Sequence, residues 1–183
     1  MQTTRSHLFI AEWRRLSGEG QRELARDIAR AVLQGALGRP EEEELARALK
    51  FRVGALRRSS EDGLAAAIRV GIVQLEARPF LDLLVQVHFS SRAEVLSTTY
   101  DLLGVEHDGT EVAEPVLEAP LDLTKVQATF AGRADAEDAA RLGLCLVVMG
   151  YVCSAAWQPG VAAALEALRS GSGKAMTAGH QGT

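Results

Sequence analysis

Residues 136–157, AEDAARLGLCLVVMGYVCSAAW, form the stretch that decides the fold. The run from Leu142 to Trp157 contains no charged side chain and is bounded by Arg141 and by Gln158-Pro159. A membrane-spanning helix needs about 20 consecutive apolar residues. The run is too short for that, so we expect a buried central helix and no membrane association.

The composition around this helix also favours helices. Hydrophobic residues make up 47% of the 183-residue chain and aromatic residues only 5%. Ala, Leu, Glu and Arg are common, and these are better helix formers than the aromatic and β-branched residues typical of strands. We therefore expect a mainly α, compact multi-helix domain of about seven helices over residues 1–170. Residues 1–6 are expected to be a loose N-terminus and residues 171–183 a flexible tail.

Apolar spacing and helix-end signals place the other helices. Leu24, Ile28 and Val32 recur at i, i+4 and i+8, which indicates one buried helix face. Pro40 suits a first helical turn, and Ser59 with Asp62 resembles a capping box. Gly104 suits a helix end, and Asp135 with Asp138 can cap the helix that follows. The expected helices cover residues 8–16, 21–34, 41–49, 59–77, 80–103, 136–157 and 160–169, with a further short helix from about residue 53 if the chain bends before it.

Residues 83–130 leave the type of secondary structure open. LLVQVHF (83–89) and LTKVQATF (123–130) suit either a strand or a helix, and Asp108-Gly109 is a good tight-turn pair. A small β-hairpin within residues 83–130, involving Val105 and Val112, is the alternative to an all-helical chain.

The charge and the cysteines restrict the class of protein. The formal net charge is −4, from 24 acidic and 20 basic residues, so any contact with nucleic acid has to be local. Cys145 and Cys153 lie in an apolar segment without CxxC spacing, which favours buried thiols in a reducing compartment. The N-terminal apolar core is too short for a secretory signal. We expect a cytoplasmic protein.

The segment 41–60, EEEELARALKFRVGALRRSS, is the one that points to a definite partner. Its apolar residues fit a helix, a tight turn and a second helix, the spacing of a helix-turn-helix. Lys50, Arg52, Arg57 and Arg58 would then lie in the turn or on the second helix, where they reach phosphates or base edges.

Over these residues the chain resembles bacterial helix-turn-helix regulators, which implies binding to duplex DNA. It departs from the family at two places. Lys50 stands where the turn usually has glycine, and the run Glu41–Glu44 would repel DNA if it faced it. The alternative is a pair of ordinary amphipathic helices, or one continuous helix, with solvated arginines.

Candidate polar and metal sites are few. The densest polar set contains His88, Arg92, Asp101, Glu106, His107 and Asp108, of which His88, Arg92, Asp101 and His107 are the candidate site. His88 and Arg92 share a face if residues 80–103 are one helix. No HxxxH or HxH spacing is present, so a metal site is not expected. Neither a nucleophile elbow nor a phosphate loop is present, so no catalytic residue is assigned.

The apolar helix carries two further patterns. Cys145, Met149 and Cys153 are spaced along one helical face, which suits a core better than a Cu(I) site. Gly143 and Gly150 also share a face and would let another helix approach closely, within the chain or from a second copy.

These observations favour a non-enzymatic helical protein-protein interaction or adaptor protein that self-associates, without cofactor or metal. Its partner is another protein, whose identity the sequence does not give. The alternative is a DNA-binding transcriptional regulator that uses residues 41–58. An enzyme with a site around His88 and His107 has the least support.

Overall fold

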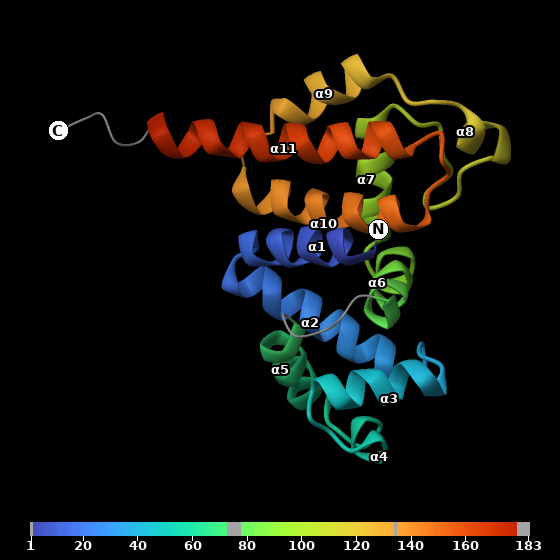
Figure 1. Ribbon diagram of the computed structural model, residues 1–183, viewed down its shortest axis with the longest axis vertical. Coiled ribbons are helices and arrows are strands. Elements are labelled where there is room, and N and C mark those ends of the chain that lie inside the picture. Colours follow the sequence, from blue (N-terminus) through green and yellow to red (C-terminus); the bar gives the residue numbers. More distant parts are fainter. Residues whose placement is uncertain (1, 73–77, 134, 179–183) are drawn as a thin grey trace. The chain divides into compact units, whose positions relative to one another are not determined.

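The computed structural model describes residues 2–72, 78–133 and 135–178 (Figure 1). These residues form eleven helices and no strand, which confirms the mainly α class. There are more helices than the seven or so predicted, because the predicted helix 80–103 is two helices and the segment after Gly104 holds two more. The helices fall into two compact units, residues 1–91 and 92–183.

The first unit is built around α2. Helix α2 (Gly18–Leu33) packs against α5 and α6, and α3 packs against α4 and α6. The predicted stripe Leu24, Ile28 and Val32 is confirmed, since all three side chains are fully buried. The other helices of this unit are α1 (Gln2–Arg15), α3 (Arg39–Ala48), α4 (Val53–Leu56), α5 (Glu61–Gly71) and α6 (Arg78–Ser90).

The second unit is built around α10 (Ala136–Val152), the predicted apolar helix. Every residue from Leu142 to Met149 is buried, which confirms the central helix near 136–157. The helix ends earlier than predicted, because Cys153 is the C-cap and a turn precedes Trp157. The other helices of this unit are α7 (Ala93–Leu103), α8 (Glu114–Glu118), α9 (Leu123–Ala131) and α11 (Gln158–Ala178).

Side-chain caps fix where several helices begin. The Asp135 carboxylate accepts a hydrogen bond of 2.7 Å from the Asp138 backbone N–H, as the sequence indicated. Ser17 caps α2 in the same way, and so does Ser60 at the start of α5. The predicted cap at Ser59 is therefore wrong by one residue, because Ser59 donates its hydroxyl to the Ala55 carbonyl instead.

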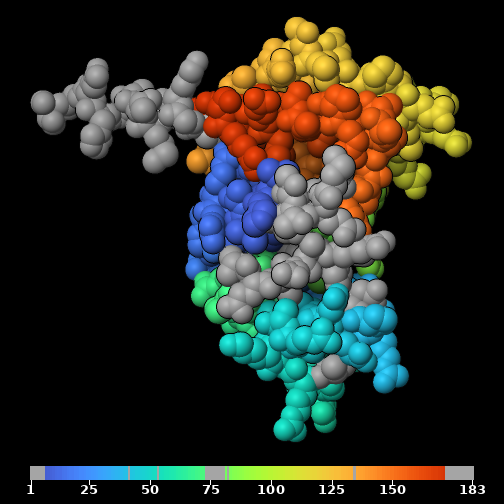
Figure 2. Space-filling model, in the orientation of Figure 1, coloured from blue at the N-terminus to red at the C-terminus, as the bar shows by residue number. Residues whose placement is uncertain are grey.

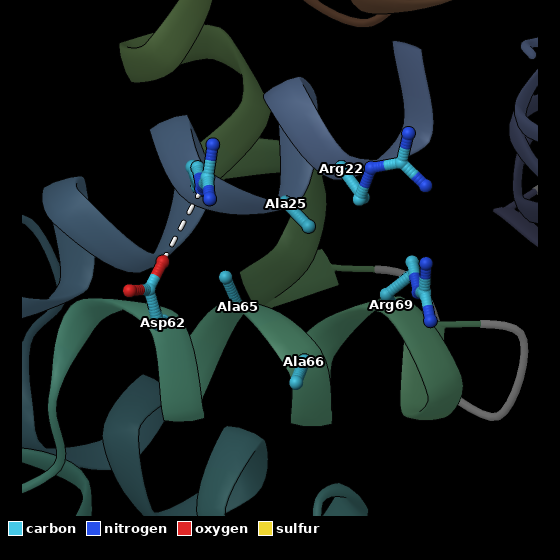
Figure 3. A pocket seen from close by; sticks show the side chains of 7 residues that line it. Arg22, Ala25, Asp62, Ala65, Ala66 and Arg69 are labelled. Atoms are coloured by element: carbon cyan, nitrogen blue, oxygen red, sulfur yellow. Dashed lines mark ion pairs between the residues drawn. The ribbon is translucent and has the colours of Figure 1, made fainter. Parts of the chain in front are cut away.

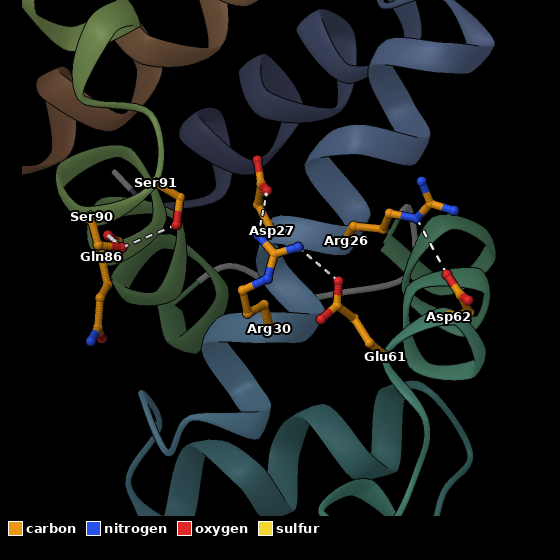
Figure 4. Close-up of polar contacts among 8 residues, drawn as sticks. All are labelled: Arg26, Asp27, Arg30, Glu61, Asp62, Gln86, Ser90 and Ser91. Carbon is orange, nitrogen blue, oxygen red and sulfur yellow. Dashed lines mark hydrogen bonds and ion pairs between the residues drawn. The ribbon is translucent and has the colours of Figure 1, made fainter.

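The predicted helix 80–103 is two helices. It is interrupted after Ser90, where the hydroxyl donates a hydrogen bond of 2.7 Å to the Gln86 carbonyl (Figure 4). Arg92 has a non-helical conformation and is the N-cap of α7. Adjacent serines compete with the helical backbone for hydrogen bonds, which favours an end at this point. The predicted end at Gly104 is confirmed by its left-handed conformation.

The alternative of a β-hairpin within residues 83–130 is wrong. The tight turn at Asp108-Gly109 is present and is closed by backbone hydrogen bonds between Asp108 and Glu111, but only as an isolated bridge. The following residues form α8 and α9, because Pro115 suits a first helical turn and Asp122 caps α9. The yellow atoms of the segment with α8 stand at the surface in Figure 2.

The two ends of the chain are more helical than predicted. Helix α1 begins at Gln2, within the expected loose end, and α11 runs to Ala178, beyond the start of the expected tail. None of the described helices is long and apolar enough to cross a membrane. The single domain over residues 1–170 stays a prediction, because the grouping of helices into units does not show whether either unit folds alone.

Substituting Gly160 of α11 tests the packing of the second unit. A Cβ atom at this position would lie 2.6 Å from Cδ1 and 2.7 Å from Cβ of Leu121, so Gly160→Ala forces a shift there. We expect a loss of about 1–3 kcal/mol in the free energy of unfolding, measured by urea denaturation, despite the better helix propensity of alanine.

Gly132→Ala is the matched control, because Gly132 is the right-handed C-cap of α9 and has room for a Cβ. Leu121→Ala should reduce the cost of Gly160→Ala in a double-mutant cycle. Equal costs with and without Leu121 would contradict the close contact.

Candidate functional site

Arginines follow one edge of α2. Arg22, Arg26 and Arg30 are spaced at i, i+4 and i+8, so they lie along one side of the helix. All three are exposed, whereas Leu24 and Ile28 on the neighbouring face are fully buried. Burial of the apolar face thus determines on which side of α2 the arginines lie.

Two of these arginines form ion pairs with the start of α5. Arg30 Nη2 lies 2.8 Å from Glu61 Oε1, and Arg26 Nε lies 3.3 Å from Asp62 Oδ1 (Figure 4). The hydrogen bond to Glu61 raises the pKa of Arg30 above its usual value. Arg30 near the end of α2 pairs with Glu61 at the start of α5, and Arg22 near the start of α2 lines the same groove as Arg69 near the end of α5, so the two helices run antiparallel.

A groove of about 290 Å³ lies between α2 and α5 (Figure 3). Its floor is made of alanine methyl groups and its rim is mostly basic, with three arginines against one aspartate. The small floor residues allow the backbone or an apolar side chain of a ligand to approach both helices. The groove is lined by Arg22, Ala25, Arg26, Asp62, Ala65, Ala66 and Arg69.

At one end of this groove, called the like-charged end, both side chains carry a positive charge. Arg22 and Arg69 lie together at this end, whereas Asp62 pairs with Arg26 at the other (Figure 3). Both arginines are exposed, and neither forms an ion pair with a carboxylate of the described residues. Guanidinium groups bind carboxylates and phosphates in a planar, bidentate geometry. This end of the groove therefore suits an anionic group supplied by a ligand.

This groove was not predicted from the sequence. A signal was present, since the three arginines of α2 recur at helical spacing and Glu61-Asp62 precedes Arg69 by two helical turns. What the sequence does not show is that α5 lies antiparallel to α2, so that two of the arginines are paired and one faces another arginine.

The segment 41–58 bends where predicted, but its second helix is too short. Helix α4 is one turn of four residues, whereas a recognition helix must reach along a DNA groove. Arg57 Nε lies 2.7 Å from Oε1 of Glu42, which is itself buried, and Arg58 donates to the Gly54 carbonyl. Lys50 and Arg52 are exposed. The second helix begins at Val53 as predicted, but it ends at Leu56 after a single turn.

Lys50 ends α3 in a left-handed conformation, with a φ of 58°. The Phe51 N–H donates to the Ala46 carbonyl at 2.8 Å, and the Lys50 N–H donates to the Arg47 carbonyl at 3.1 Å. These two bonds define a Schellman motif in which glycine is the usual residue at position 50. The same pair of bonds ends α2 at Gly35 and α7 at Gly104.

The structure brings together only part of the predicted polar set. His107 Nε2 lies 3.1 Å from Asp101 Oδ1, and no described residue hydrogen-bonds the buried Nδ1 of His107. His88 is buried in α6 with Nδ1 2.9 Å from the Leu84 carbonyl, and Arg92 belongs to the second unit. The prediction that His88 and Arg92 share a helix face is wrong, because the helix is interrupted between them.

The cysteines and glycines of α10 lie in the core of the second unit. Cys145 and Gly143 are buried, and Cys153 is the C-cap, so the predicted row of three sulfurs does not continue along the helix. A Cβ at Gly150 would lie 3.5 Å from Val161 of α11, which places this glycine against a helix of its own chain. In the described part of the chain no three His, Cys, Asp or Glu side chains could hold a metal ion.

Comparison of the chain with models of protein families, with curated proteins and with solved structures found no match.

Replacing Lys50 by glycine should stabilise the protein. A side chain in the left-handed region costs roughly 1–2 kcal/mol, and the greater freedom of glycine in the unfolded chain offsets about 0.5–1 kcal/mol of that cost. We expect Lys50→Gly to raise the free energy of unfolding by about 0.5–1 kcal/mol in urea denaturation. Arg47→Gly, inside α3, is the matched control and should lower it by about 1 kcal/mol. Destabilisation by both changes would exclude strain at Lys50.

The stability of the fold should depend on pH in the alkaline range, because a thiol and a phenol that lose protons there are buried. Burial raises the pKa of the Cys145 thiol from 9.0 to about 12, against the opposing effect of a hydrogen bond with Thr99. Burial also raises the pKa of Tyr100 from 10.0 to about 12, with smaller contributions from Cys145 and Cys153. Above the unfolded pKa values the unfolded chain releases protons that the folded chain keeps. The free energy of unfolding should therefore fall as the pH rises from about 9 toward 12.

Tyr100→Phe keeps the ring beside Trp157, at a centroid distance of 6.2 Å, but removes the ionisable hydroxyl. Urea denaturation at a series of pH values from about 8 to 11 should show a shallower loss of stability for this variant than for the wild type. An unchanged slope would show that Tyr100 ionises equally in both states.

Proposed function

We propose that the protein is a non-enzymatic helical interaction or adaptor protein that binds an acidic segment of a partner protein in the groove between α2 and α5. The observation that carries this proposal is the pair Arg22 and Arg69, two exposed arginines at one end of the groove without a carboxylate from the described residues. A carboxylate of the partner would complete the pattern of ion pairs begun by Arg30 and Arg26.

The chemistry of the groove supports binding rather than catalysis. Arginine stays protonated at all physiological pH values, so it supplies fixed charge and hydrogen bonds but neither a general base nor a nucleophile. The remaining lining residues are three alanines and Asp62, which is held by Arg26. Arginine is also among the residues that most often dominate the binding energy of protein interfaces.

A cytoplasmic location is part of the same proposal. Cys145 and Cys153 form no disulfide bond. Burial raises the pKa of Cys145 and thereby disfavours the reactive thiolate. Two cysteines of one compact unit without a disulfide bond fit a reducing compartment better than an oxidising one.

The DNA-binding alternative has less support. The bend at Lys50 and the exposed Arg52 favour it, but the one-turn α4 and the pairing of Arg57 with Glu42 oppose it. Duplex DNA on the same protein samples separates the two functions. The regulator is supported if the protein binds duplex DNA in a salt-sensitive way and the double variant Arg57→Glu, Arg58→Glu no longer does. The absence of such binding would exclude the regulator.

An acidic peptide probe tests the proposed interaction. The probe is a fluorescein-labelled peptide of repeated Glu-Ala-Ala-Ala units, and fluorescence anisotropy measures its binding. A few exposed charge pairs would give a dissociation constant on the order of 10–100 µM at low salt, weakening as salt is added. The double variant Arg22→Glu, Arg69→Glu should weaken binding by at least about tenfold, because it reverses both free charges.

The matched control is Arg47→Glu with Arg52→Glu, two exposed arginines of the same unit that do not line the groove. This control should leave peptide binding within about twofold, since only the general charge changes. A peptide with Gln in place of Glu should not bind. If both double variants lose the same affinity for the peptide, binding depends on the general charge and not on the groove, which would contradict the proposal.

A further inference from the structure

The two units of the chain carry charges of opposite sign. Residues 1–91 contain 14 basic and 12 acidic residues, whereas residues 92–183 contain 6 basic and 12 acidic residues. The basic groove belongs to the first unit and most of the excess acid belongs to the second. A second copy of this chain therefore offers a surface complementary to the groove.

The acidic residues of the second unit are concentrated before Lys125. Residues 93–124 contain no lysine or arginine. Glu111, Glu114 and Glu118 are exposed, and none of them forms an ion pair within the described chain. Glu114 and Glu118 lie one helical turn apart on α8.

Two hydrogen bonds hold α8 to its own unit. The buried Trp157 donates from Nε1 to the Val116 carbonyl at 3.2 Å, and the Ser154 hydroxyl donates to the Leu117 carbonyl. These bonds use the backbone of α8 and leave its glutamates in solvent. The acidic edge, defined as Glu111, Glu114 and Glu118, is thus presented by an anchored element rather than by a free loop.

We propose that the acidic edge of one copy docks on the like-charged end of the groove in a second copy, so that the partner of Arg22 and Arg69 is this chain itself. This inference rests on the proposed function and names its partner. Carboxylates of the acidic edge would neutralise two guanidinium groups that have no carboxylate of their own among the described residues. The contact is distinct from the glycine face of α10, which packs within the chain at Gly150.

Such a contact is head-to-tail. Each copy carries one groove and one acidic edge. Contacts between these unlike surfaces join copies into a closed ring, in which every groove and edge is occupied, or into an open chain with one free surface at each end. The contact depends on exposed charges and is therefore weak and salt-sensitive. The average mass should rise with protein concentration at low salt and return to that of a monomer when salt is added.

Sedimentation velocity on the full chain tests the inference with two charge-reversed variants. The groove variant carries Arg22→Glu and Arg69→Glu, and the edge variant carries Glu114→Lys and Glu118→Lys. Each alone should stay monomeric at concentrations where the wild type associates, a loss of affinity of about tenfold or more. An equimolar mixture should associate again, because each variant keeps the wild-type surface that the other lacks.

Two controls keep the result specific. Arg47→Glu with Arg52→Glu, and Glu94→Lys with Glu166→Lys, reverse the same numbers of exposed charges outside the groove and the acidic edge. Both should associate like the wild type. Circular dichroism melting of every variant shows that it folds.

Three results would overturn the inference: a wild type that stays monomeric at low salt, association that both variants leave unchanged, or a mixture that stays monomeric. If the wild type stays monomeric but the acidic peptide still binds through Arg22 and Arg69, the proposed function stands and only the identity of its partner is wrong. If the peptide does not bind either, both proposals fail.

Discussion

Burial of one face of α2 is the constraint on which the candidate site depends. Leu24, Ile28 and Val32 have no exposed surface, so α2 cannot rotate about its axis without exposing them to water. Complete burial of such side chains contributes roughly 1.5–3 kcal/mol each. The same rotation sets the direction of every other side chain on the helix, including the arginines. The position of the charges is therefore a consequence of the apolar packing.

The acidic net charge of the protein does not describe its local surfaces. A chain with a formal charge of −4 nevertheless has a groove with three arginines and one aspartate. At physiological salt, screening limits the reach of exposed charges to about 8 Å, so a ligand in the groove responds mainly to the nearest side chains. For this reason the net charge excludes a general polyanion-binding surface but allows a small site of the opposite sign.

The sequence predicted the local features well. Apolar spacing identified α2, the uncharged run identified α10, and the signals at Pro40, Gly104 and Asp135 placed three helix ends correctly. Each of these signals acts within a few residues of chain, which is why one sequence suffices to find it.

The predictions from sequence failed where the structure depends on tertiary contacts or on competing local hydrogen bonds. The helix expected over residues 80–103 ends at Ser90, because a serine hydroxyl competes for a backbone carbonyl. The second helix of the 41–58 segment is reduced to one turn before α5 begins. The groove itself was missed because the pairing of Arg30 with Glu61 joins residues far apart in sequence. Spacing along the chain shows which arginines share an edge, but not what lies opposite them.

The two arginines at the end of the groove have a thermodynamic consequence for a protein with a bound ligand. One belongs to the start of α2 and the other to the end of α5, so a single anion at this end would contact both helices. A ligand that binds the folded chain and not the unfolded chain raises the free energy of unfolding by an amount that grows with the logarithm of its concentration above the dissociation constant. An anion in the groove would therefore link the occupancy of the groove to the stability of the first unit.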